Sequence, residues 1–189
     1  MTGGQSAGTE SPSLVRDVLH LVASPPGALV RGVVTDNLRS TDRLRWYPSL
    51  LLEGYDEDPM QQALADDATL LGVPVVTTRS RRGLPGVDDV RMFFDDWFYV
   101  RNTYPSLVHV HATSTSLRSS SARWLSPVLR RIPLVVSVYP TDEAGDPPGF
   151  AAVEVRRAGR RVSHGRVDLP ALREANWLYD AVLAKHRRR

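Results

Sequence analysis

The stretch Ser106–Pro140 decides the fold; it reads SLVHVHATSTSLRSSSARWLSPVLRRIPLVVSVYP. Two short apolar runs rich in β-branched residues, 107–111 and 134–139, predict two buried strands. A helix expected over 119–131 supplies the crossover between them, so the two strands should run parallel. In open parallel sheets, ligands bind beyond the carboxyl ends of the strands. Because both runs end in polar side chains, this stretch indicates where to look for function as well as the fold.

The same alternation of strand and helix occupies the chain before this stretch. Apolar runs predict strands at 17–23, around 50–52 and at 73–78, and helical spacing predicts helices at 28–39, 59–71 and 88–104. Strands that alternate with helices of this length form a parallel sheet covered on both faces. We therefore predict an α/β fold over residues 14–140, a single Rossmann-like doubly wound parallel sheet of about five strands.

The two ends of the chain differ from this pattern. Residues 1–13 are small and polar without an apolar period, which is typical of a disordered leader. Residues 141–149, rich in Pro, Gly and Asp, predict a linker. Beyond it, residues 150–189 predict a β-hairpin plus helix appendage. The basic residues that end this last helix complement its dipole and need no nucleic-acid partner to explain them.

Composition narrows the classes of function. The 189 residues contain no cysteine, so disulfides and thiolate metal sites are excluded. The net charge is +3, and Lys185 is the only lysine, an arginine bias that fits a GC-rich genome. No dense basic face is evident, so no nucleic-acid partner is expected. No apolar run approaches the ~20 residues of a membrane span and no signal peptide is evident, so we expect a cytoplasmic protein.

Two histidines are the first candidate ligand contacts. His109 and His111 are two residues apart on a predicted strand, so both rings point to one face with their Cα atoms ~7 Å apart. They could contact a polar ligand, or pack against a helix with backbone partners. A catalytic zinc ion needs about three protein ligands. The spacing of the remaining residues supplies no third ligand, so we expect neither a metal nor a cofactor.

The loops after the strands hold the other candidates. Gly27 follows two prolines in the first strand-to-helix loop; this does not fit a dinucleotide-binding fingerprint but lets a ligand approach the backbone. Ser119 lies among hydroxyls that could cap a helix or hold an anion. Arg81 and Arg82 could clamp a phosphate or lie in a solvated loop. Tyr139 closes the last strand, and no catalytic residue can be assigned.

The aromatic side chains of the helix expected over 88–104 allow two interpretations. Its aromatic side chains most simply belong to the core, but their spread around the helix leaves one side that could meet a protein partner. The aromatic residues are Phe93, Phe94, Trp97, Phe98 and Tyr104.

From Val18 to Tyr139, the order of these pieces resembles the N-terminal domain of GT-B fold glycosyltransferases of the glycogen-synthase and sucrose-synthase-like superfamily. The segment 104–111, YPSLVHVH, is similar to the family's P-D-V-V-H-x-H motif, and 70–75, LLGVPV, is similar to the entry to its third strand. The resemblance implies an acceptor-binding domain. It also implies that His111 and the loop after the strand 134–138 line the cleft to a second, nucleotide-sugar domain.

The chain also departs from that family. Ser106 stands where the motif has Asp, Tyr139 stands where the last strand is followed by His, and Pro26–Gly27 replaces a Gly-Gly pair. Residues 150–189 are too few to form a nucleotide-sugar domain. The resemblance therefore implies a glycosyltransferase-like acceptor-binding domain that is inactive alone. A donor-domain protein would be its partner, and a sugar or sugar-lipid its acceptor.

Two alternatives remain open from the sequence. The first is a non-catalytic protein-interaction module that kept the Rossmann-like core and lost the chemistry. The second is a small hydrolase or nucleotide-binding enzyme with His111 as general base, since the pKa of histidine suits that role. The second lacks a nucleophile or acid at matched spacing.

Overall fold

The computed structural model describes residues 15–54, 58–79, 87–129, 131–141, 149–157 and 160–187. Its centre is a seven-stranded sheet in the order β3-β2-β1-β4-β5-β6-β7. The strands from β3 to β5 are parallel, whereas β6 and β7 are antiparallel to their neighbours. The strands are β1 (Arg16–Val22), β2 (Trp46–Gly54), β3 (Val75–Arg79), β4 (Leu107–Thr113), β5 (Leu134–Tyr139), β6 (Phe150–Arg157) and β7 (Arg160–Asp168).

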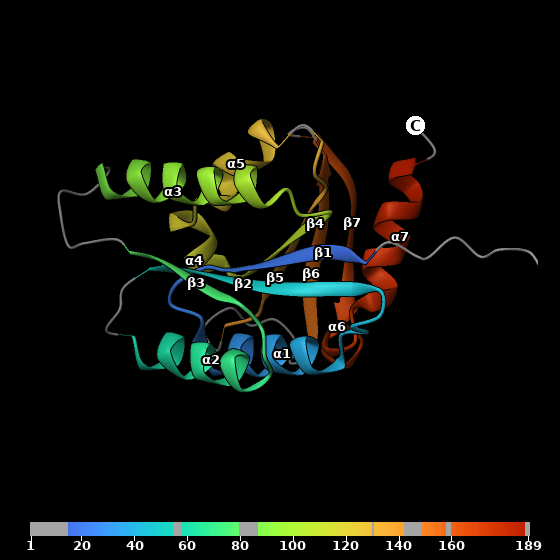
Figure 1. Cartoon of the computed structure of the whole chain (residues 1–189), viewed down its shortest axis with the longest axis horizontal. Helices are drawn as coiled ribbons and strands as arrows, with labels where there is room; N and C mark the ends of the chain where they lie inside the picture. Colours follow the sequence, from blue (N-terminus) through green and yellow to red (C-terminus); the bar gives the residue numbers. More distant parts are fainter. Residues whose placement is uncertain are drawn as a thin grey trace, which may run out of the picture.

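Helices cover both faces of this sheet (Figure 1). On the first face, apolar side chains of α1, α2, α6 and α7 pack on the sheet, and on the second those of α3 and α5 do so. The helices are α1 (Gly27–Ser40), α2 (Pro59–Leu70), α3 (Val87–Thr103), α4 (Ser114–Ser119), α5 (Ala122–Val128), α6 (Leu169–Arg173) and α7 (Asn176–Arg187). The prediction of an α/β fold with a parallel sheet covered by helices on both faces is thus confirmed for β1 to β5, and the strand order is compatible with a Rossmann-like sheet.

Strand alternation decides which side chains meet which helices. On β1, Val18 and Val22 face the α1 side while Leu19 and Leu21 face the α3 side, and all four are fully buried. The other central strands alternate in the same way, as expected where both faces of a parallel sheet are covered. The odd-numbered residues of β4 and β5 therefore lie beneath α1 and α7.

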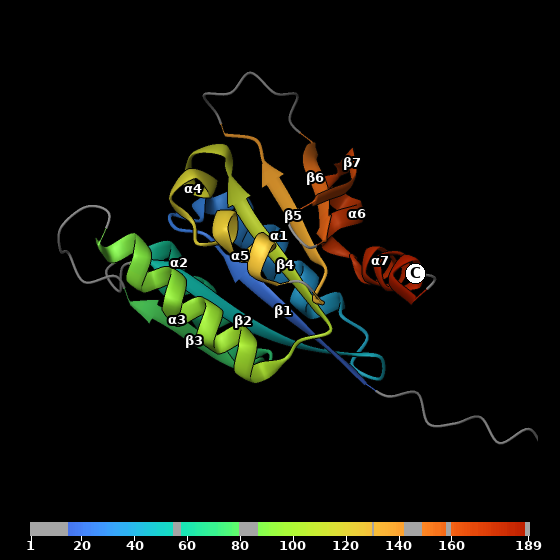
Figure 2. The ribbon, with the colours of Figure 1, turned by 90° about the horizontal axis from the view of Figure 1, so that it is seen from above.

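The sheet is larger than the sequence predicted. β6 pairs antiparallel with β5, from Leu134 opposite Arg156 to Val138 opposite Ala152, and β7 pairs with β6. The predicted hairpin therefore continues the sheet, and α7 lies beyond it in Figure 2. The expected count of about five strands is wrong. The physical reason is that β5 would otherwise leave an open edge of unpaired backbone groups.

The segment after β4 also differs from the prediction. Instead of one helix over 119–131, it forms the two short helices α4 and α5. A capping box starts α4 early: the Thr113 side chain accepts from the Ser116 backbone, and the Ser116 hydroxyl accepts from the Thr113 backbone. The predicted leader, 1–13, and residues 142–148 of the predicted linker lie outside the described residues.

Candidate functional site

The sheet has a switch point between β1 and β4. The chain leaves β1 through Ser24–Gly27 into α1 on one face, and leaves β4 through Thr113 into α4 and α5 on the other. Because the strand order is 3-2-1-4-5, the connections after β1 and β4 run in opposite directions along the sheet. In open α/β sheets, ligands bind where neighbouring connections diverge beyond the carboxyl ends of the strands. The loops after β1 and β4 are therefore the first place to expect a ligand.

Three histidines lie side by side on the α1 face of the sheet. His20 of β1 is in register with His109 of β4, and His111 follows two residues later on the same face. All three side chains are completely buried. Nδ1 of His20 lies 3.1 Å from Nε2 of His111. The register of two neighbouring parallel strands thus adds a third imidazole to the pair that the sequence suggested.

The hydrogen bonds of Asn37 on α1 determine the proton positions on His109. Asn37 donates from Nδ2 to the Leu172 carbonyl at 2.7 Å, so its Oδ1 accepts the Tyr179 hydroxyl proton at 3.0 Å. With that proton used, the Tyr179 oxygen accepts from Nδ1 of His109 at 2.9 Å. Nε2 of His109 then carries the lone pair and accepts from the Ser137 hydroxyl at 2.8 Å. α7 is in this way hydrogen-bonded to the central strand β4.

Tyr139 holds the second histidine of β4. Its hydroxyl lies 2.8 Å from Nδ1 of His111, and the two rings are stacked. On the other side of this group, Nε2 of His20 is buried and has no hydrogen-bond partner. A buried nitrogen without a partner is costly, so His20 is the weakly satisfied member of the histidine cluster, by which we mean His20, His109 and His111.

Burial keeps the histidine cluster neutral. Burial, with a smaller contribution from the positive charge of Arg43, lowers the pKa of His20 to about 3. Burial also lowers the pKa of His109 and of His111 well below the usual value, with a smaller contribution from neighbouring histidines. At neutral pH each ring therefore has one N–H and one lone pair. Neutral rings can accept hydrogen bonds or ligate a metal, but they bring no positive charge to a ligand.

A pair of buried carboxyl groups lies on the opposite face, at the carboxyl end of β2. Oε1 of Glu53 accepts from the backbone and the hydroxyl of Ser121, at 3.0 and 2.5 Å. In the described part of the chain, no hydrogen bond within 3.5 Å reaches its Oε2 or either carboxyl oxygen of Asp96 on α3, although the nearby hydroxyls of Ser121 and Thr78 act to lower the pKa of Asp96. Glu53 is 1% exposed and Asp96 is 0% exposed. Buried carboxylates without donors are expensive, so this acid pair, Glu53 and Asp96, is a strained polar element of the core.

The acid pair holds on to protons. Burial raises the pKa of Glu53 well above its usual value, and the negative charge of Asp96 raises it further. Burial is also the main reason that the pKa of Asp96 is raised. A protonated Glu53 can donate its Oε2 proton to Asp96, so that one proton shared by the pair stabilises both buried groups. Perturbed carboxyl groups at the ligand-binding edge of a parallel sheet are candidates for a functional site.

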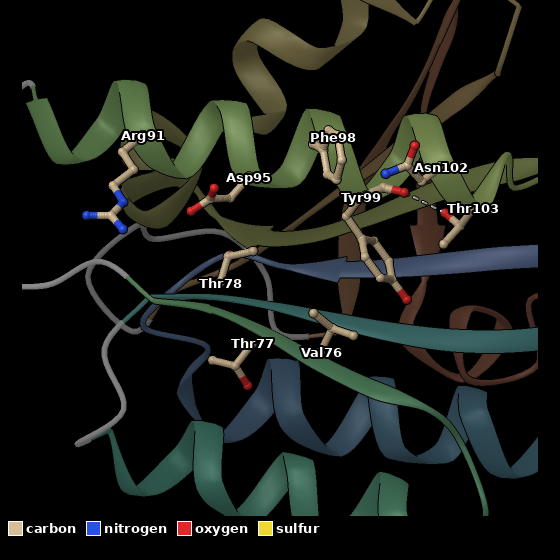
Figure 3. Close-up of a pocket in the computed structure, with 9 residues that line it drawn as sticks. All are labelled: Val76, Thr77, Thr78, Arg91, Asp95, Phe98, Tyr99, Asn102 and Thr103. Atoms are coloured by element: carbon tan, nitrogen blue, oxygen red, sulfur yellow. Dashed lines mark hydrogen bonds between the residues drawn. The ribbon is translucent and has the colours of Figure 1, made fainter.

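An open pocket of about 680 Å³ lies between β3 and α3 (Figure 3). We call it the β3–α3 pocket. β3 forms its floor, and α3 supplies both polar and aromatic groups along its length. The lining residues are Val76, Thr77, Thr78, Arg91, Asp95, Phe98, Tyr99, Asn102 and Thr103. Among the described residues, β3 pairs only with β2, so this pocket runs along the open edge of the sheet.

The pocket joins an apolar ring to planar polar groups. Phe98 is 62% exposed, and in Figure 3 Asp95 and Asn102 lie on the same helix to either side of it. Arg91 lies one turn before Asp95. Carboxylate, amide and guanidinium groups offer acceptors and donors in fixed planes, while an exposed ring offers an apolar surface. That combination suits a ligand with many hydroxyl groups and one apolar face, as a sugar has.

The structure brings together only some of the residues singled out from sequence. His109, His111 and Tyr139 lie in one buried network and have at most 1% of their surface exposed. Gly27 lies apart at the start of α1, where its φ of +57° suits glycine. Ser119 is exposed and donates to the carbonyl of Ser116. Arg81 and Arg82 lie outside the described residues. That these residues bind a ligand stays a prediction.

The sequence did not reveal three buried residues that could take part in chemistry, namely His20, Glu53 and Asp96. His20 sits in an apolar run that reads simply as a strand, and only the register of β1 against β4 places it beside His109. Glu53 and Asp96 are 43 positions apart, and no local spacing joins them. For Glu53 there was a signal: an acidic residue at the end of an otherwise apolar strand.

Comparisons with known proteins add little. No protein-family model matches the chain, and no curated protein matches it either. Among solved structures, it is similar to the UDP-GlcNAc 2-epimerase from Neisseria meningitidis, bound to UDP-GlcNAc, with a TM-score of 0.42 and 13% sequence identity. The similarity covers 64% of this chain and 31% of the epimerase chain. At this TM-score and sequence identity, the similarity carries no information about function.

Proposed function

We propose that this chain is a glycosyltransferase-like acceptor-binding domain. It binds a sugar or sugar-lipid acceptor and depends on a separate nucleotide-sugar domain for transfer. The β3–α3 pocket is the observation that carries the proposal, because it places the Phe98 ring among the side chains of Asp95, Asn102 and Arg91. The Rossmann-like strand order and the motif at 104–111 support the same assignment.

The groups on the two faces of the sheet indicate which steps this chain could perform and which a partner domain would perform. Among the described residues, no histidine lines the pocket to act as a base for its carboxylate and hydroxyl groups, and the histidine cluster is buried on the other face. The acid pair lies closer, because Thr78 lines the pocket and is in register with Glu53 on the neighbouring strand. We propose that the pocket binds and orients the acceptor, while the bond-forming groups come from the partner domain. The purified chain should then bind sugars without transferring them.

A titration of the purified chain with methyl glycosides of glucose, mannose and N-acetylglucosamine, followed by ligand-observed NMR, tests this proposal. Phe98→Ala should weaken binding of the best glycoside about tenfold, the factor that 1.4 kcal/mol gives, through loss of the stacking surface. Phe94→Ala is the matched control, since Phe94 is also exposed on α3 but does not line the pocket. Equal binding by wild type and Phe98→Ala would remove the pocket from the proposal.

A non-catalytic interaction module is the second candidate, and one observation favours it. The aromatic rings of Phe94 and Phe98 are both exposed on α3, and Phe98 lines the pocket along β3, the edge strand among the described residues. An open strand edge flanked by exposed rings is a common way to bind another protein. If none of the glycosides binds, and both alanine variants weaken capture of a protein partner, the module is the better account.

A further inference from the structure

The histidine cluster has the donors of a metal site. One ring nitrogen from each of His20, His109 and His111 can be chosen so that all three lie within 4.8 Å of one another. Zinc bonds to imidazole nitrogen at 2.0–2.1 Å, so tetrahedral donors are separated by about 3.3 Å. The His20 Nδ1 to His111 Nε2 separation, 3.1 Å, is already close to that value. The third nitrogen, from His109, lies within 4.8 Å of the other two and would have to give up a hydrogen bond to bind the ion.

The proton positions allow a metal ion between His20 and His111, whose rings are otherwise joined by one hydrogen bond. When Nδ1 of His111 donates to the Tyr139 oxygen, its Nε2 presents a lone pair to His20. His20 can likewise carry its proton on Nε2, which has no partner to lose. Two lone pairs would then face each other across 3.1 Å. They repel unless a proton or a metal ion lies between them.

The neighbours of the cluster resemble the supports of known metal sites. Histidines that bind metals usually use the other ring nitrogen in a hydrogen bond, which fixes the tautomer and aims the ring. Tyr139 plays this part for His111, and Tyr179 plays it for His109. The lone pair of His109 is held by the Ser137 hydroxyl, a weak partner that a metal could displace. Neutral imidazoles are also the form that metals bind.

We propose that His20, His109 and His111 together bind one divalent transition-metal ion of the zinc class. Imidazole donors suit zinc, copper and nickel and do not suit magnesium or calcium. The ion would tie β1 to β4 beneath α1 and α7 at the switch point of the sheet. Because the three side chains are completely buried, the ion would have a structural role, with its fourth coordination position filled by water or another small ligand.

Zinc binding to the full-length chain tests the proposal. Metal is removed from the chain with EDTA, and the chain is then dialysed against ZnCl₂. Elemental analysis measures the bound zinc, and thermal unfolding measures its effect on stability. We expect one zinc per chain and a higher Tm, and Co²⁺ should give the visible spectrum of a tetrahedral site. His164→Gln, which changes an exposed histidine on β7, should bind as wild type does. His20→Phe should lose the bound ion.

A second variant keeps the test decisive if His20→Phe does not fold. Ser137→Ala removes the hydroxyl that competes for the lone pair of His109, so it should tighten zinc binding several-fold. A purely structural role for Ser137 predicts lower stability and no change in zinc affinity. The proposal is overturned if the wild-type chain binds no zinc after dialysis, or if a folded His20→Phe variant binds as much zinc as wild type. It is also overturned if Ser137→Ala leaves the zinc affinity unchanged.

Discussion

The hydroxyl of Tyr179 on α7 lies 2.9 Å from Nδ1 of His109 on β4, at the centre of the sheet. Tyr179 is completely buried and also donates to Asn37 at 3.0 Å. One phenol oxygen therefore connects the C-terminal helix, the first helix and a central strand. This link explains why α7 belongs to the core of the molecule.

Tyr179→Phe should destabilise the protein by about 1–3 kcal/mol. The substitution keeps the ring but leaves Nδ1 of His109 and Oδ1 of Asn37 buried without a partner. Urea unfolding followed by circular dichroism gives the free energy of unfolding. Tyr47→Phe, at a half-exposed position on β2, is the control and should change it by less than about 0.5 kcal/mol. An equal effect of the two substitutions would contradict the network.

Removal of residues 150–189 should cause aggregation. β5 would lose its neighbour β6 and present an open edge. The apolar side chains that pack under α6 and α7, including those of Val135 and Trp46, would also become exposed. Light scattering and size-exclusion chromatography of the shortened chain measure this. A monomeric, folded product would show that the segment is an interaction arm.

Glu53→Gln should stabilise the protein at neutral pH by about 1–3 kcal/mol. Its Oε1 can still accept from Ser121, and its new amide can donate to Asp96 without the carboxyl proton that wild-type Glu53 must keep. Glu53 has a raised pKa, so the folded state binds its proton more tightly than the unfolded state does. The stabilisation that protonated Glu53 gives the wild-type protein is therefore full below the unfolded pKa of about 4.3, and it is lost as pH rises through the folded pKa.

The gain from Glu53→Gln should accordingly grow with pH. Chemical denaturation of both proteins at pH 5 and pH 8 measures the difference. Glu174→Gln, at an exposed position, should show no such trend. A gain that is constant between the two pH values would mean that Glu53 is ionised throughout.

Gly54→Ala should destabilise the protein by about 2–4 kcal/mol, because two costs combine. Gly54 has a φ of +126°, which is strained for any side chain, and an added Cβ would lie 2.4 Å from the Cβ of Ser24. Gly32→Ala on α1 is the matched control: nothing lies within 4 Å of its added Cβ, so helix propensity should stabilise by about 1 kcal/mol. Thermal unfolding of both variants gives the comparison. Equal effects of the two substitutions on stability would contradict the close approach of Gly54 to Ser24.

The sequence predicts the parallel half of the fold well, because its information is local. Apolar runs of five to seven residues and amphipathic helices between them follow from residues close together in the chain. The pairing of β6 with β5 could not be read in this way, since it depends on an open edge that exists only after the sheet has formed. The split between α4 and α5 was missed because the cap formed by Thr113 and Ser116 outweighs the apolar period.

The candidate site was predictable only in part, for a similar reason. His109 and His111 could be paired from their spacing on one strand, and Tyr139 from its place at a strand end. His20 and Tyr179 reach the same place through strand register and helix packing, which no local spacing encodes. The aromatic helix was expected mainly in the core, yet Phe94 and Phe98 are exposed, as its predicted partner-facing side allowed.

Amide chemical shifts of the ¹⁵N-labelled chain, recorded during a titration with the same methyl glycosides, test the central claim most directly. The account predicts saturable shifts confined to β3 and α3, around Thr78 and from Arg91 to Thr103, that vanish in Phe98→Ala. Shifts centred on the loops after β1 and β4, or no shifts with any of the sugars, would contradict an acceptor site in the β3–α3 pocket.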